Sequence, residues 1–123
     1  MSIEMFKRNL IQFIDELYKQ SSYDEFILAH IYVENKICIK ELMDTCVSQY
    51  QILKSNVLSK NMDDVFQNTL LKEYSIFLRK LWYSSLLDDS DKEVIWKWME
   101  LILYDIERYQ TMCEQQLKIK KND

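Results

Sequence analysis

The chain of 123 residues contains no glycine and no proline. Glycine supplies the positive φ angles that tight β-hairpin turns need, and proline is the strongest helix breaker. A β-sandwich or an α/β enzyme without glycine would be very unusual, and turns that need a positive φ fall to Asn, Asp or Ser. Glycine-rich loops that cradle phosphates are also excluded. The composition therefore predicts an all-α fold.

Concentrated positive charge, long apolar runs and an even number of cysteines are missing as well. A net charge of −4 disfavours nonspecific binding to nucleic acid. Three cysteines without a CxxC motif predict reduced thiols and a reducing compartment. The first residues lack the apolar core of a signal peptide, and no run approaches the roughly 20 apolar residues that span a bilayer. We expect a chain that is neither secreted nor transmembrane.

Helical periodicity is the main positive signal. Apolar residues make up 48% and charged residues 29% of the chain, which predicts one globular domain over 1–118, with a frayed basic tail at 119–123. Apolar residues recur every three or four positions, as in a compact bundle of about five or six helices. The expected helices are Ser2–Lys19, a second one from a Ser22/Glu25 capping box to Asn35, Ile39–Ser55, a short one from Asp63, Tyr74–Leu87 and Asp91–Lys118. One unbroken helix over Asp24–Ser55 stays open as an alternative.

The last expected helix begins at a second capping box, Ser90 with Glu93, and carries two tryptophans. At about 100° per residue, its apolar arc spans roughly 200°, twice what a surface helix usually needs. Such a helix is either central in its bundle or presents a second face to a partner. Trp98 borders the main apolar stripe more closely than Trp96 does, so Trp96 is the better interface candidate.

The edge of this arc that carries Trp96 is the predicted partner interface. It comprises Trp96, Leu103, Glu100 and Glu107. Aromatic residues such as tryptophan are enriched at protein interfaces. The expected partner is another protein or a second copy of this chain, with no small-molecule substrate.

Candidates for chemistry are few. His30, Glu34 and Cys38 follow one another at intervals of four, so one continuous helix would place three possible zinc ligands on one face. The chain has a single histidine, and a helix break near Asn35 would separate the set, so a structural histidine with a buried free cysteine is the favoured interpretation. His30 beside one of the other two cysteines would resemble a nucleophile pair, but random placement explains the spacing equally well. We therefore assign no catalytic, cofactor or metal residues and expect no enzyme.

Basic residues gather at the C-terminus, where Lys118, Lys120 and Lys121 suit a helix end and its dipole. These lysines are the residues that would contact phosphate in the alternative function, that of a nucleic-acid-associated packaging or transcription accessory protein. Nucleic-acid binding of that kind depends on phosphate contacts and weakens steeply with salt.

One segment carries a family resemblance. Leu81-Trp82, an acidic spacer and then Ile95-Trp96-Lys97-Trp98 are similar to a pattern in small helical proteins of giant nucleocytoplasmic DNA viruses. That pattern reads roughly Ile-Trp-Lys-Tyr-Leu-Gln after an upstream Leu/Ile-Trp, so Trp98 and Glu100 depart from it. The resemblance implies an all-helical viral protein in the host cytoplasm or the virion. It supplies no catalytic residues and no function. From the wide apolar arc and the few candidates for chemistry, we expect a non-enzymatic viral protein that acts by protein–protein interaction, as a virion structural or accessory component.

Overall fold

A computed structural model describes the backbone of residues 2–66 and 75–122, and side chains within 3–65 and 75–118. This part of the chain is all-α, as predicted, and folds into seven helices rather than five or six. They are α1 (Ser2–Ser21), α2 (Asp24–Asn35), α3 (Ile39–Ser48), α4 (Tyr50–Leu58), α5 (Met62–Phe66), α6 (Ser75–Trp82) and α7 (Asp89–Asn122).

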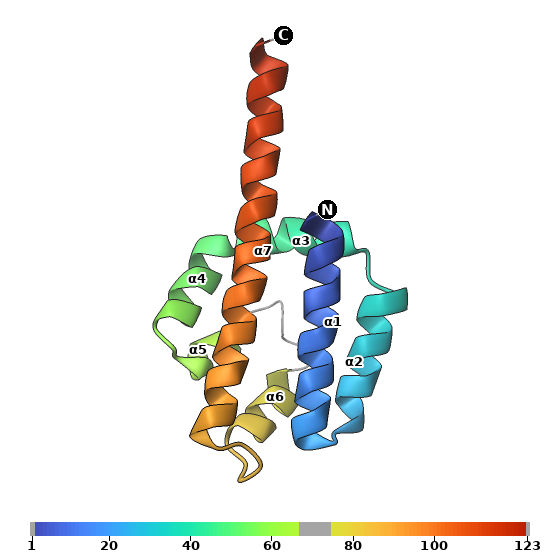
Figure 1. Ribbon diagram of the computed structural model, residues 1–123, viewed down its shortest axis with the longest axis vertical. Helices are drawn as coiled ribbons and strands as arrows, with labels where there is room; N and C mark the ends of the chain where they lie inside the picture. The colour runs from blue at the N-terminus through green and yellow to red at the C-terminus, as the bar shows by residue number, and fades with distance from the viewer. Residues whose placement is uncertain (1, 67–74, 123) are drawn as a thin grey trace.

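Helices α1 and α7 lie side by side and run in opposite directions (Figure 1). Helix α2 packs along the outer side of α1, and α4 and α5 lie on the other side of α7 (Figure 1). Helix α3 crosses one end of the bundle, and α6 lies near the other. The C-terminal part of α7 extends well beyond all the other helices (Figure 1). The prediction that the first and last helices are central is therefore confirmed.

Two groups of buried side chains form the core. The larger group joins α1, α2, α4, α5, α6 and the start of α7, and it includes Phe13, Phe26 and Trp96. The smaller group surrounds α3 and includes Phe6 and Met43. Three half-buried residues pack against both groups, so they mark the junction between them: Leu10, Ile102 and Leu103. Burial of this apolar surface is the main favourable term in folding.

A buried polar pair sets the register between α1 and α7. The side-chain amide of Asn9 donates to Oδ2 of Asp105 at 2.7 Å, and both residues are at least 92% buried. A buried polar group costs free energy unless it has a hydrogen-bond partner. This pair therefore favours the one alignment of the two helices in which both groups are satisfied.

The turn between α1 and α2 uses serine where other proteins place glycine. Ser22 has φ 57°, as expected for a chain without glycine, whereas the other described residue with a positive φ, Lys60 at 52°, is not one of the expected Asn, Asp or Ser residues. The Ser21 hydroxyl donates to the Leu17 carbonyl and accepts from the Tyr23 N–H. The predicted Ser22/Glu25 capping box is wrong, because α2 begins at Asp24 and its N-cap, Tyr23, forms no side-chain cap.

The predicted helix Ile39–Ser55 is divided in two at Gln49. Hydroxyl groups explain the break, because Thr45 donates to the Glu41 carbonyl and Ser48 donates to the Thr45 carbonyl at 2.7 Å. Such local hydroxyl bonds compete with the helical ladder. The alternative of one helix from Asp24 is wrong too, because α2 ends at Asn35.

The boundaries of the last two helices also differ from the prediction. Tyr74 lies outside the described residues, and α6 ends at Trp82, because the Ser84 hydroxyl donates to the Leu81 carbonyl and starts a turn. The capping box of α7 is formed by Asp88 and Asp91, each accepting the other's N–H, rather than by Ser90 and Glu93. Helix α7 then continues to Asn122, beyond the predicted end at Lys118.

Candidate functional site

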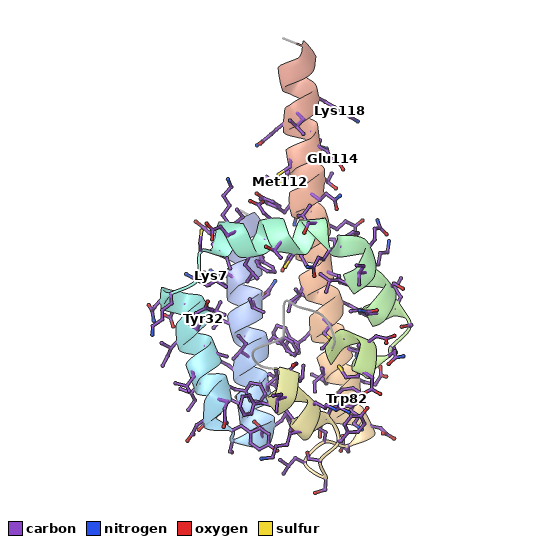
Figure 2. The ribbon with its side chains drawn as sticks, turned by 180° about the vertical axis from the view of Figure 1, so that it is seen from behind. Lys7, Tyr32, Trp82, Met112, Glu114 and Lys118 are labelled. Carbon is purple, nitrogen blue, oxygen red and sulfur yellow. The ribbon has the colours of Figure 1, made fainter. Side chains whose placement is uncertain are left out.

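Trp96 belongs to the core rather than to an exposed edge. It is only 4% exposed, and its ring meets that of Trp82 edge-on with the centroids 5.6 Å apart. Trp82 comes from α6, at the end of the bundle opposite the extended part of α7 (Figure 2). The Lys92 ammonium lies 5.0 Å from the centroid of the Trp82 ring. The prediction that Trp96 is available to a partner is therefore wrong, because α6 covers it.

The opposite edge of the apolar arc is the exposed one. Val94, Leu101 and Tyr104 are 41%, 39% and 54% exposed. Trp98, which we expected to be the more buried tryptophan, is half-buried and stacks on Phe13 of α1 with the centroids 6.2 Å apart. The helical wheel thus predicted the wide apolar arc, but it assigned the exposed edge to the side of Trp96, which is the buried one.

The other predicted interface residues do not form one surface patch with Trp96. Leu103 is half-buried at the junction of the two core groups. Glu100 is exposed, and Glu107 is exposed and accepts a hydrogen bond from the Tyr50 hydroxyl at 3.0 Å. Burial first, and this carboxylate second, raise the pKa of Tyr50. Glu107 therefore helps to hold α4 against α7.

The basic end of the chain lies on the extended part of α7. Lys118 is exposed there, beyond Met112 and Glu114 (Figure 2). The side chains of Lys120 and Lys121, the other two predicted phosphate contacts, lie outside the described side chains.

His30 joins α2 to α1. Its Nδ1 lies 2.5 Å from Oδ1 of Asp15, and its Nε2 lies 2.8 Å from Oε2 of Glu34. The hydrogen bond to Asp15 raises the pKa of His30 most; burial opposes that shift, and Glu34 adds to it. The Lys7 ammonium donates to the Glu34 carbonyl at 3.0 Å, close to the end of α2. Both ring nitrogens are occupied by carboxylates, so the imidazole binds α2 to α1.

The cysteines are not placed for the chemistry considered above. Cys38 is exposed just before α3, so the end of α2 separates it from His30 and Glu34. Cys46 is buried, and burial raises the pKa of its thiol to about 12, which keeps it neutral. Within residues 3–65 and 75–118, no group of three His, Cys, Asp or Glu side chains is arranged to hold a metal ion.

Helix α2 exposes a row of large apolar side chains on one of its faces. We call Ile27, Leu28, Ile31 and Tyr32 the outer face of α2; they are 40%, 61%, 42% and 38% exposed. The inner face buries Phe26, Ala29 and Val33 against α1. No other described helix packs closely on the outer face, which lies at the edge of the bundle (Figure 1).

The sequence contained a signal for this surface. Seven of the eight residues from Phe26 to Val33 are apolar, and the eighth is His30. A helix that is apolar all round needs neighbours on every side or exposes the remainder. Ile27 and Ile31 belong to this run, and both are exposed.

Comparisons with protein-family models, curated proteins and solved structures found no match to this chain. Over the described residues, no helix combines the length and apolarity needed to cross a membrane. The function proposed below is therefore inferred from the geometry of the molecule.

Proposed function

We propose that the protein acts by protein–protein contact through the outer face of α2, and that its partner is a second copy of the same chain. The observation that carries this proposal is the exposure of four large apolar side chains on one helix face. Contiguous exposed apolar surface is kept small on monomers and often marks an interaction site.

The arrangement of these side chains suits helix-on-helix packing. Ile27 and Ile31 form one row with a spacing of four residues, and Leu28 and Tyr32 form a second row beside it. Rows of this spacing are the ridges that interlock when two helices cross at about −50°, the commonest packing of helices in globular proteins. A two-fold axis that lies beside the outer face of α2, between the two copies, would place the same two rows of the second copy against them.

The charges around this face also favour a copy of the same helix. Between Glu25 and Glu34, the only side chain that carries charge near neutral pH is His30, which is held against Asp15 of α1. Two copies of α2 can therefore meet along their centres without burying an unpaired charge, which would be costly. We infer a non-enzymatic role for this surface.

Sedimentation equilibrium or light scattering over a concentration series tests the proposal. We expect a monomer–dimer equilibrium for the native chain and a dissociation constant at least about tenfold higher for Leu28→Glu, since the dimer would bury a carboxylate against apolar side chains. Leu58→Glu is the matched control, because Leu58 is 67% exposed at the end of α4, away from α2.

Each alternative result has a clear meaning. A native chain that stays monomeric at high concentration would exclude the second copy as partner. Equal weakening by Leu28→Glu and Leu58→Glu would place the contact elsewhere. Circular dichroism of both variants must match the native spectrum, so that loss of the dimer is separated from loss of the fold.

We further propose, from the resemblance of the Ile95-Trp96-Lys97 segment, that this chain is a protein of a giant nucleocytoplasmic DNA virus and a component of its virion. The burial of Trp96 against Trp82 supports a role of this motif in the fold rather than in binding. Mass spectrometry of purified particles tests the setting: peptides of this chain in the particles would support a virion component, and their absence would exclude one.

A further inference from the structure

An apolar cavity of about 120 Å³ lies at the junction of the two core groups. Its deeper wall includes the buried residues Phe6, Phe13 and Val57. Its outer part is lined by half-buried residues, among them Leu103 and Asn56. The cavity therefore reaches from the core towards the surface between α4 and α7.

The lining decides which molecules can occupy this space. All of its lining residues except Asn56 are apolar or carry a thiol, and the Cys46 thiol remains protonated because burial raises its pKa to about 12. A buried water needs two to four polar partners, which such a lining does not offer. A charged or strongly polar ligand would lose its hydration without compensation.

The volume also limits the size of the occupant. Engineered apolar cavities of roughly 150 Å³ stay dry and bind benzene or xenon. An empty space of this kind leaves its lining without dispersion contacts on one side, so a guest that restores those contacts is favoured.

We propose that this cavity is a binding site for one small uncharged hydrocarbon group, an aryl ring or a short alkyl chain. The half-buried residues give such a group a route into the core, and Asn56 is the one lining residue whose side chain can meet a polar end of the ligand. The inference is independent of the contact proposed for α2.

Xenon and benzene are suitable probes, followed by methyl NMR spectra of the full chain. We expect saturable shifts of the methyl groups of Val57, Val65 and Leu103, which line the cavity. The methyl groups of Val33 should not shift, because Val33 is equally buried, 5% exposed, but lies on α2 outside the lining. No saturable shift at the lining would overturn the proposal, and so would equal shifts at Val33.

Filling the cavity is the second test. The double variant Val57→Leu/Val65→Leu adds two methylenes to the lining and should weaken benzene binding by at least about tenfold, since the guest then overpacks the core. Val33→Leu is the matched control and should leave binding unchanged. Unchanged binding in the double variant would contradict the assigned site.

Two further measurements keep the test decisive. If the double variant does not fold, Leu103→Phe fills the cavity from its half-buried side and should weaken binding in the same way. Comparison of benzene with n-hexane distinguishes a ring from a chain: binding of either supports the proposal, and binding of neither overturns it. A chain that binds benzene but stays monomeric would support the cavity and contradict the contact through α2.

Discussion

Two apolar helix surfaces of this molecule differ in exposure: one is buried under another helix, and the other is exposed. The Trp96 edge of α7 was predicted to be exposed and is buried against Trp82 of α6. The outer face of α2 carries Ile27 and Ile31, which no described helix covers and which are exposed. Both surfaces are strongly apolar, and they differ in whether another helix covers them.

The comparison shows what a local pattern determines. The width of an apolar arc tells how much surface a helix must bury for stability. Which part is buried depends on neighbours supplied by distant parts of the chain, here α6 for Trp96. Apolar surface that the fold leaves uncovered, as on α2, is then available to a partner.

The largest expected effect is on the covered surface. Trp96→Ala should lower the free energy of unfolding by about 3–5 kcal/mol, because it removes a large buried ring and leaves a cavity beside Trp82. Urea denaturation followed by circular dichroism measures the change. A loss of unfolding free energy below about 1 kcal/mol would contradict the burial of Trp96. The Trp96 edge would then be exposed, like the outer face of α2.

A smaller effect is expected where α2 is attached to α1. The pKa of His30 is raised in the folded state, so its contribution to stability is full below its usual pKa of about 6.5 and is lost as the pH rises through the folded-state value. Its side chain is 30% exposed, so the contribution is at most about 1 kcal/mol.

Urea denaturation at pH 5.5, 7 and 8.5 checks this contribution. His30→Gln should remove the fall in stability between these values, because glutamine does not titrate. A native chain whose stability does not fall over this range would show that Asp15 and Glu34 do not hold a protonated imidazole.

The turn that places α2 beside α1 gives a third test. Ser22→Gly should raise the free energy of unfolding by up to about 1 kcal/mol, because glycine adopts the φ of 57° without strain. Ser21→Gly is the contrasting variant and should lower stability, since the Ser21 hydroxyl bonds the Leu17 carbonyl and the Tyr23 N–H. Thermal unfolding that ranks the two variants the other way would contradict the geometry of this turn.

The smallest effect is expected on the uncovered surface. Leu28→Gln should change the stability of the monomer by less than about 0.5 kcal/mol, because Leu28 is 61% exposed. Phe26→Ala, on the inner face of the same helix, should cost about 3–5 kcal/mol. Denaturation at low protein concentration measures both, and similar losses would show that the outer face is covered within the monomer.

Much of the fold was predictable because it depends on local periodicity. The absence of glycine and proline predicted the all-α class. The three- and four-residue spacing of apolar residues predicted the helix Ser2–Lys19, and α1 buries Phe6, Phe13 and Leu17, which have this spacing. The break at Gln49 and the end of α6 were missed, because they depend on hydroxyl groups that bond nearby carbonyls. Ser48 and Ser84 look like ordinary helix residues until their hydrogen bonds are known.

The candidate surface was harder to predict for a different reason. The run from Phe26 to Val33 contains more apolar residues than one buried helix face can hold. The sequence pattern does not show which side of the helix another helix will cover. The cavity beside Val57 and Leu103 is less predictable still, because it arises where side chains from α1, α3, α4, α5 and α7 meet imperfectly.

The hydrogen bond between Asn9 and Asp105 has a mechanical consequence. Sliding α7 along α1 by one helical turn, about 5.4 Å, would separate the two groups and leave both without their partner inside the core. The Asn9–Asp105 pair therefore resists sliding of α7 along α1. Force applied to the extended end of α7 would be transmitted to α1 through this hydrogen bond. A force-spectroscopy trace should show that α7 separates from α1 only after the hydrogen bond has broken.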